Sequence, residues 1–221
     1  TLLTGGFRVL CVAVLYRGCG LPVAWAVQAA DEKGSWNNIW FDLLDRLKKA
    51  LGEGWTVLVL TDRGLESPDL FREIVRLGWH ALMRVKKCAK FRPANWRKGY
   101  WLAHFASHAG GRWSGEGVAY PSGSHLECTL LACWEVGHDE PWLLLTDLPA
   151  SGANPAWYGW RMWVEQGFRA FKRGGWQWQR TQMRESVRVA RLWAVMAVAT
   201  VYAVEVGDVR GQGRRVGVRS R

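Results

Sequence analysis

Between residues 7 and 86 the sequence alternates short, β-branched apolar runs with segments of helical periodicity. Two runs, at residues 7–18 and 21–30, are separated by glycine and predict an antiparallel pair of strands. The next apolar runs, at 55–62 and 79–87, each follow a segment with apolar residues on one helical face. Because strands alternate with helices in this way, we expect an α/β sheet with parallel crossovers.

The second half of the chain departs from this rhythm. Residues 88 to about 140 contain glycine pairs and short apolar runs, which indicate a small β-rich insertion. An apolar run at 141–149 predicts a return to a buried strand, and a last helix is expected at about 185–206. The glycine- and arginine-rich residues 207–221 predict a basic, disordered tail.

The chain has 221 residues and a formal net charge of +11, which indicates a polyanionic partner, either nucleic acid or an anionic membrane surface. Its cations are spread along the chain, and this favours a folded basic surface over a basic arm. The apolar run at 192–204 is shorter than the roughly 20 residues that span a bilayer. We therefore expect it to form a buried core helix, with no membrane partner.

Capping signals define a helix after the last strand. Asn154 is a good N-cap, and Pro155 fits the first helical position because its missing N–H has no partner there. Gly174 and Gly175 mark the expected end of this helix. Earlier in the chain, Ser35 is an expected N-cap of the same kind.

This helix carries a lone carboxylate among aromatic rings and cations. If the helix is continuous, Tyr158, Arg161, Glu165 and Lys172 fall within roughly 60° of one another on one stripe about 20 Å long. One reading is a solvated face with an ion pair between residues four apart. The other reading is a metal-binding acid flanked by phosphate contacts, and spacing alone does not decide between them.

Asp62 ends the apolar run at 55–62, which we expect to be a strand buried on both faces. Carboxylates at the carboxyl edge of such a sheet can bind Mg²⁺, which prefers oxygen ligands. A turn-initiating aspartate ahead of a glycine is the alternative reading for Asp62. Asp147 is a rival acid at another strand end, but it is read more simply as a turn residue. His104 and His108 are four residues apart, a weak indication of zinc.

The spacing Tyr158-x2-Arg161-x3-Glu165-x6-Lys172 resembles the Y-R-E-K signature of DDE-type insertion-sequence transposases of the insertion-sequence 4-like group. The segment "VLTDRG" at Asp62 is similar to the second-acid motif of that family, and the resemblance covers residues 1 to about 206. It implies a ribonuclease H-like mixed sheet flanked by helices, with a β-rich insertion between the second aspartate and the glutamate. It also implies strand cleavage and transfer at transposon ends with Mg²⁺ or Mn²⁺, by a homodimer on DNA.

Carried over by position, Asp62 and Glu165 correspond to the second and third metal-binding acids of the family. The positions of Tyr158, Arg161 and Lys172 correspond to residues that hold the DNA end. The cluster of Trp176, Trp178 and Arg180 could stack on unpaired bases at a DNA end or pack under the β-rich insertion. The full set of candidate DNA-contacting residues is Tyr158, Arg161, Lys172, Arg63, Arg84, Trp176, Trp178 and Arg180.

The family places its first aspartate just ahead of a segment like residues 1–10, and the first apolar run at 7–18 contains no acid. We therefore expect an N-terminally truncated catalytic domain at residues 1–206, without its first strand and inactive by itself. Five irregularly spaced cysteines indicate a reducing compartment, in line with a prokaryotic, nucleoid-associated protein. A ribonuclease H-like nuclease without strand transfer and a non-catalytic DNA-binding remnant of a mobile element are the alternatives.

Overall fold

The computed structural model describes residues 2–4, 6–32, 34, 36–173, 176–180 and 182–215. The chain divides into two compact units: unit 1 comprises Thr1–Leu47 and Trp160–Arg221, and unit 2 comprises Lys48–Gly159. The expected N-cap Ser35, the expected helix stop at Gly174 and Gly175, and residues 216–221 of the expected tail lie outside the described residues. Helix α1 (Asn37–Leu51) contains the first boundary between the units, and Gly52 ends it with a φ of +68°.

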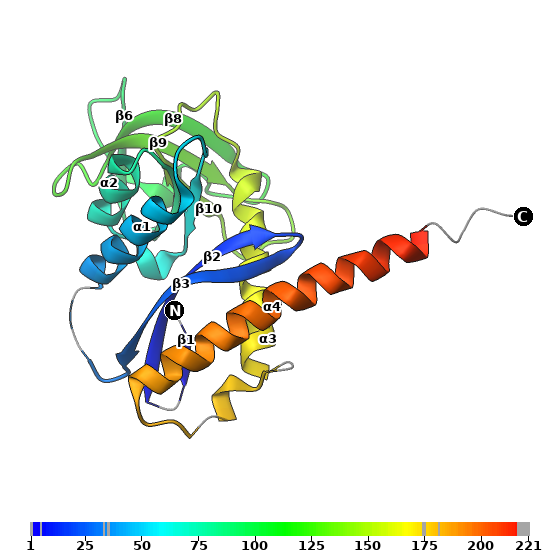
Figure 1. Ribbon diagram of the computed structural model, residues 1–221. Helices are drawn as coiled ribbons and strands as arrows, with labels where there is room; N and C mark the ends of the chain where they lie inside the picture. Colours follow the sequence, from blue (N-terminus) through cyan, green and yellow to red (C-terminus); the bar gives the residue numbers. More distant parts are fainter. Residues whose placement is uncertain are drawn as a thin grey trace, which may run out of the picture. The chain divides into compact units, whose positions relative to one another are not determined.

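Unit 1 contains a small antiparallel sheet, most of helix α1, and helices α3 (Arg161–Arg173) and α4 (Ser186–Arg215) (Figure 1). Its strands are β1 (Leu2–Thr4), β2 (Phe7–Tyr16) and β3 (Cys19–Ala29), in the order β1-β2-β3. Tyr16 pairs with Cys19, and Arg17 and Gly18 between them have φ of 49° and 78°. Positive φ at both central residues is the geometry of the tight hairpin turn that suits twisted strands. The expected antiparallel strand pair is confirmed.

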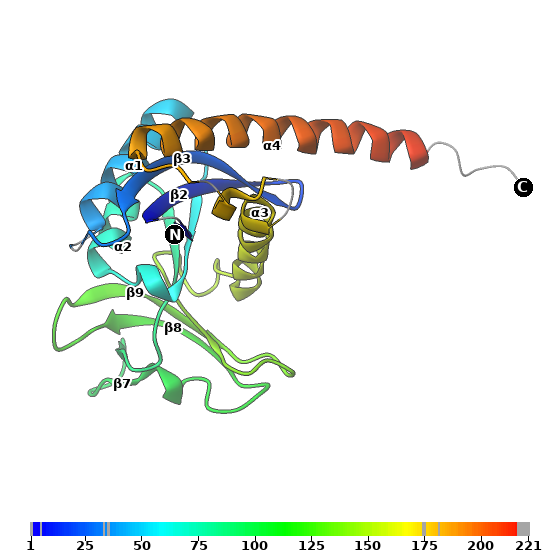
Figure 2. The same cartoon turned by 90° about the horizontal axis from the view of Figure 1, so that it is seen from below.

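Helices α3 and α4 pack on β3 (Figure 2). The core between these elements is aromatic. The Trp193 ring of α4 stacks on Phe171 of α3 with ring centroids 5.1 Å apart, and the edge of Trp178 meets Trp193 at 5.3 Å. Val9 and Cys11 of β2 complete this buried cluster.

Helix α4 is longer than expected. It continues to Arg215, so residues 207–215 are helical where the sequence predicts a disordered tail. Only one face of its apolar segment is buried, whereas Val195, Val198 and Tyr202 are exposed. Among the described residues, Ser186–Gly207 is the one helical segment whose length and composition would allow it to cross a membrane. One such helix is weak evidence, and it is insufficient to indicate a membrane.

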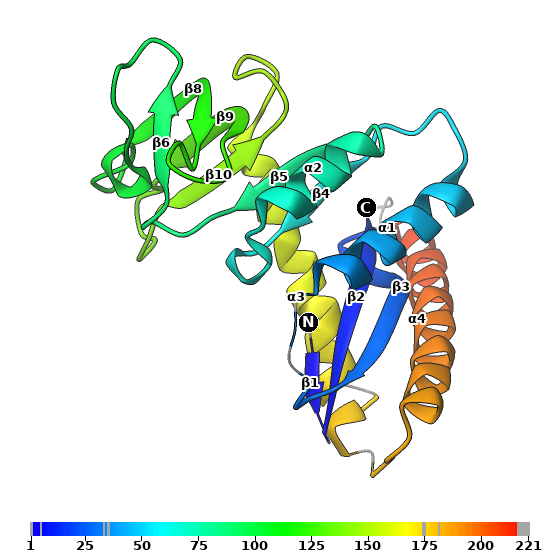
Figure 3. The ribbon, with the colours of Figure 1, turned by 90° about the vertical axis from the view of Figure 1, so that its left-hand side faces the viewer.

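Unit 2 is built on a mixed, mostly antiparallel seven-stranded sheet (Figure 3). The strand order is β4-β5-β10-β9-β8-β6-β7. The strands are β4 (Leu58–Thr61), β5 (His80–Arg84), β6 (Lys90–Pro93), β7 (Tyr100–Trp101), β8 (Arg112–Ala119), β9 (Leu126–Cys133) and β10 (Trp142–Thr146). Strands β6 to β9 fall within the residues expected to form a β-rich insertion, and they continue the sheet of β4, β5 and β10.

The parallel crossover predicted from the sequence links β4 to β5. These strands pair in parallel, and helix α2 (Pro68–Arg76) connects them and packs on β5. The Ser67 hydroxyl accepts a hydrogen bond from the Leu70 N–H at 3.2 Å, which is the usual side-chain cap of a helix N-terminus. Strand β10 pairs antiparallel with β5, and so the sheet is mixed.

Strand β4 is less buried than the sequence predicts. Its apolar run predicts a strand buried on both faces, yet Leu58, Val59 and Leu60 are half-buried. Among the described strands β4 pairs only with β5, at the edge of the seven-stranded sheet. An edge strand lacks a neighbour whose side chains would cover one flank, and this accounts for the exposure.

Candidate functional site

Asp62 follows directly after β4, at the carboxyl end of that strand. It is the N-cap of a short 3-10 helix, η1 (Arg63–Leu65), and its Oδ1 accepts a hydrogen bond from the Gly64 N–H at 3.0 Å. The turn-initiating role is therefore present in the structure. A carboxylate has two oxygens and several lone pairs, so this hydrogen bond is compatible with metal binding.

A second carboxylate, Glu140, lies beside the same sheet edge. Thr61 pairs with Met83, and so Asp62 and Arg84 follow at the adjacent ends of β4 and β5. Glu140 accepts hydrogen bonds from Arg63 at 2.8 Å and from Arg84 at 2.7 Å. The two candidate DNA-contacting arginines of unit 2 thus converge on one acid.

Glu66 fixes the segment that follows Asp62. One of its carboxylate oxygens accepts a hydrogen bond from the Lys86 N–H at 2.9 Å, and the other accepts one from the Tyr120 hydroxyl at 2.8 Å. Burial, together with the charge of Glu66 and this hydrogen bond, raises the pKa of Tyr120 well above its ordinary value. The Tyr120 hydroxyl therefore stays protonated and continues to donate at neutral pH.

Asp147 occupies a different place in unit 2. Its Oδ1 accepts the Ala81 N–H at 2.7 Å, and its Oδ2 lies 2.7 Å from His80 Nδ1. Because β10 is antiparallel to β5, the end of β10 lies at the beginning of β5, away from the edge that carries Asp62. Asp147 is therefore bound to His80 and Ala81, at the opposite end of the strands from Asp62.

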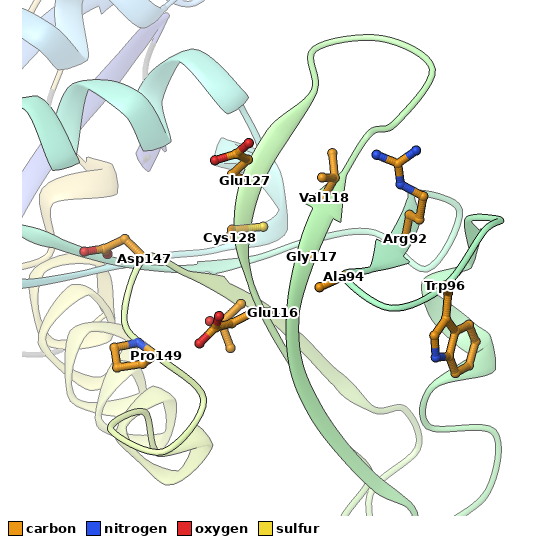
Figure 4. A pocket seen from close by; sticks show the side chains of 11 residues that line it. Arg92, Ala94, Trp96, Glu116, Gly117, Val118, Glu127, Cys128, Asp147 and Pro149 are labelled. Atoms are coloured by element: carbon orange, nitrogen blue, oxygen red, sulfur yellow. The ribbon is translucent and has the colours of Figure 1, made fainter.

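An open pocket of about 590 Å³ lies beside Asp147, and Glu116 and Glu127 also line it (Figure 4). Despite these acids, no group of three or more His, Cys, Asp or Glu in the described part of the chain could hold a metal ion. His104 stacks on Tyr100 with ring centroids 5.2 Å apart, and His108 Nδ1 lies 3.4 Å from the Ser107 hydroxyl. The weak zinc indication therefore gains no support.

The helix that carries Glu165 begins later than the sequence predicts. Asn154 caps the segment, since its Oδ1 accepts the Ala156 N–H at 2.9 Å, but Pro155–Trp160 forms the 3-10 helix η3. The α-helix α3 begins at Arg161. The expected continuous stripe through Tyr158 is therefore wrong, because a 3-10 segment turns a residue to a different angle from an α-helix.

Tyr158 is buried, with 3% of its surface exposed. Its ring meets Trp142 with centroids 5.4 Å apart and packs against Leu82, Leu131 and Leu144 of unit 2. The ring is thus part of the hydrophobic core. Its expected contact with a DNA end stays a prediction that would require this segment to open.

The stripe does hold for the residues within α3. Arg161 and Glu165 form an ion pair between residues four apart, with 25% and 52% of their side chains exposed. Lys172 lies two turns further along and is half-buried. The ion-pair reading is therefore realised, and the half-exposed Glu165 carboxylate remains accessible to a ligand.

Two glycines set the position of α3 in unit 1. A Cβ atom on Gly167 of α3 would lie 2.7 Å from the Gly20 carbonyl oxygen of β3. A Cβ atom on Gly20 would lie 2.8 Å from the Val164 Cα. Such distances are too short for real carbon contacts, so α3 rests on β3 backbone to backbone.

The Trp176–Arg180 segment divides between surface and core. Trp178 begins the 3-10 helix η4 (Trp178–Arg180) and is 1% exposed in the aromatic core of unit 1. The Trp178 ring packs on Trp193, and its expected contact with DNA stays a prediction that would require this segment to open. Trp176 is 39% exposed, and Arg180 is exposed.

Glu140 and Glu66 were missed by sequence reasoning. Glu140 is 77 positions from Arg63 and 56 from Arg84, and no motif links them. The only local signal is the pair of adjacent acids Asp139–Glu140 just before an apolar strand.

A family model, described as the transposase DDE domain, matches residues 7–202. This match spans both carboxylates of the proposed pair, Asp62 and Glu165. No curated protein matches the chain. The mixed sheet with an acid at the carboxyl end of β4 is compatible with a DDE nuclease fold. With most of its length matched, the chain belongs to the transposase DDE domain family, whose members cleave and join DNA.

Proposed function

We propose that this chain is the catalytic part of a DNA transposase that cuts and transfers strands at the ends of an insertion sequence, and that Asp62 and Glu165 bind its Mg²⁺ or Mn²⁺. Membership of the transposase DDE domain family is the observation that carries this proposal. The insertion-sequence 4-like group is the one whose Y-R-E-K spacing the chain reproduces.

The donor chemistry of the two acids suits the metal. Mg²⁺ prefers carboxylate oxygens, and Asp62 stands at a strand end while Glu165 is half-exposed on a helix. When bound, the metal would supply activation of water and stabilisation of the leaving oxygen in phosphodiester cleavage. Asp62 is held in place by the Gly64 N–H, and the Arg161 guanidinium beside Glu165 could exchange its partner for a phosphate.

The metal chemistry calls for three acids, and we propose that the first is not among the described residues. A ribonuclease H-like core places the strand with the first acid beside the strand with the second. Among the described strands, β4 pairs on one edge only and keeps a partly exposed apolar run, which supports a missing neighbour there. We expect this chain to bind DNA but to cut it poorly by itself.

The remaining features of the proposal concern DNA and assembly. Arg161, Lys172, Arg63 and Arg84 are proposed to neutralise phosphates, and the exposed Trp176 and Arg180 to contact the DNA end. Strands β6 to β9 are proposed to be the insertion between the second and third acids. The protein is proposed to act as a homodimer on DNA in the prokaryotic cytoplasm, at the nucleoid.

The test is Mg²⁺-dependent cleavage and joining of a donor DNA that carries the element's ends. This polypeptide, a version extended upstream, and Asp62→Asn and Glu165→Gln variants of the longer form are compared. Asp31→Asn is the matched control, because Asp31 is an exposed loop acid outside the proposed site. We expect only the longer form and its Asp31→Asn variant to cut and join.

Other outcomes select the alternatives. Robust cleavage by the short form would show that another acid fills the set and that the assignment of three acids is wrong. Cutting without joining would identify a ribonuclease H-like nuclease. DNA binding without cleavage by either form would identify a non-catalytic remnant of a mobile element.

A further inference from the structure

The Glu140 carboxylate bridges two arginines at the sheet edge that carries Asp62. Its Oε2 accepts a hydrogen bond from Arg63 Nη1 at 2.8 Å, and its Oε1 accepts one from Arg84 Nη2 at 2.7 Å. Each oxygen therefore serves a different guanidinium. Arg63 follows Asp62 in the chain, and Arg84 ends the strand paired with β4.

The two arginines differ in how firmly they are held. The Arg84 side chain is 15% exposed, and its guanidinium lies 6.0 Å from the centroid of the Tyr158 ring. Arg63 and Glu140 are 45% and 46% exposed. One cation is thus held from the interior, while the carboxylate and the other cation face solvent and can exchange partners.

A pocket of about 270 Å³ adjoins the Arg63–Glu140 pair. Two cations and two acids line it, Arg63, Lys87, Asp139 and Glu140, together with apolar residues such as Leu143. The loop before β10 contains Gly137 at a φ of +89°, and Val136 within it is 79% exposed. Glu140 is therefore carried by an exposed loop and not by a strand.

The charge state of Glu140 agrees with this role. Burial acts to raise its pKa, but the hydrogen bond from Arg63 and the charges of Arg84 and Arg63 outweigh burial and hold the pKa below its ordinary value. The carboxylate is consequently ionised wherever DNA binding is measured near neutral pH.

We propose that Glu140 is an internal substitute for a DNA phosphate: it occupies Arg63 and Arg84 in the free protein and is displaced when DNA reaches the carboxyl end of β4. The inference rests on the proposed DNA-cleaving function and adds a residue that limits access to that site. A phosphodiester, like a carboxylate, presents two negatively charged oxygens to arginine. The alternative is that this ion pair only anchors the loop before β10.

The experiment measures binding of a short fluorescein-labelled DNA duplex to the full chain by anisotropy over a range of salt concentrations. Glu140→Gln keeps the size of the side chain but removes its charge. Glu135→Gln is the matched control, because Glu135 lies in the same loop and pairs with Arg112, an arginine outside the proposed site. Thermal unfolding confirms that each variant is folded.

We expect Glu140→Gln to bind more tightly and with a steeper dependence on salt. Each newly neutralised phosphate changes the slope of log K against log salt by about 0.9, which makes the gain about eightfold at 0.1 M salt relative to 1 M. Glu135→Gln should leave the slope unchanged. Arg63→Ala should cost less in the wild type, where breaking the pair with Glu140 offsets part of the gain from the phosphate, than in the Glu140→Gln background, where it should abolish the gain.

Equal slopes for Glu140→Gln and Glu135→Gln would overturn the inference, as would an equal cost of Arg63→Ala in both backgrounds. These results would leave the proposed function standing, provided that the wild type binds DNA. Failure of the wild type and of Glu140→Gln alike to bind DNA at low salt would instead overturn the proposed function.

Discussion

Replacing Gly167 by alanine tests how α3, and with it Glu165, is held in unit 1. In an ordinary helix interior this change is favourable by about 1 kcal/mol, because glycine has the poorer helix propensity. Here the new Cβ atom would lie 2.7 Å from the Gly20 carbonyl oxygen and 3.4 Å from the Gly20 nitrogen. Both are backbone atoms of β3, so the contact is relieved only by moving α3.

Overpacking of this kind costs about 1–3 kcal/mol, and a backbone obstacle places the cost near the upper end. After the gain in propensity, we expect a net loss of about 2 kcal/mol, which lowers the midpoint of thermal unfolding by roughly 4–8 °C. The assay is thermal unfolding followed by tryptophan fluorescence, because Trp178 and Trp193 are buried in unit 1.

Gly207→Ala provides the control. Gly207 lies in α4, and a Cβ atom there meets nothing within 4 Å. Propensity then acts alone, and the variant should be as stable as the wild type or more stable by up to about 1 kcal/mol. A Gly167→Ala protein that is stabilised like Gly207→Ala would refute the close approach of α3 and β3.

Three further predictions concern DNA binding, packing and thiol chemistry. Lys172→Ala should weaken DNA binding across sequences and reduce the slope of log K against log salt by about one unit. An unchanged slope would show that Lys172 contacts no phosphate. Trp178→Ala should cost about 3–5 kcal/mol in urea unfolding, because the ring is 1% exposed, whereas a loss below 1 kcal/mol would place it outside the core. The exposed Cys88 should react first with a thiol reagent at pH 8. Burial raises the pKa of Cys11 from 9.0 to about 12, so at pH 8 this thiol should have about a thousandfold less thiolate than a thiol of pKa 9.0. Equal rates for the two cysteines would contradict the burial of Cys11.

The elements that the sequence predicts correctly depend on local signals. The hairpin of β2 and β3 follows from two apolar runs around a glycine-containing turn, and Arg17 and Gly18 adopt the positive φ that such a turn needs. The crossover from β4 through α2 to β5 follows from the alternation of apolar runs with a segment of helical periodicity. Neighbours in the chain determine these features.

The expectations fail where contacts between residues distant in the chain determine the structure. Tyr158 was expected in the α-helix but lies in the 3-10 helix η3. The expectation failed because the capping signal of Asn154 and Pro155 fits the start of either type of helix. The choice between stacking on DNA and packing in the core for Trp178 depends on Trp193, which is on another helix.

The candidate site was predictable only in part. Motif spacing proposes Asp62 and Glu165 as metal ligands, because each stands in a run whose pattern is local, and this assignment stays a prediction. The partner of Arg63 and Arg84 was not predictable, because the loop that carries Glu140 reaches them through the pairing of β5 with β10. The burial of β4 was overestimated, because an apolar run does not reveal whether a strand has one neighbour or two.

The central claim is that Asp62 and Glu165 bind the same metal ion. Fe²⁺ can stand in for Mg²⁺ at an oxygen-ligand site, and with ascorbate and peroxide it generates radicals that cut the nearest polypeptide backbone. Mapping these cuts in the full chain should give breaks beside Asp62 and beside Glu165, both suppressed by excess Mg²⁺ and both lost in Asp62→Asn. Cuts beside only one of the two acids, or cuts at Glu165 that persist in Asp62→Asn, would contradict a shared metal site.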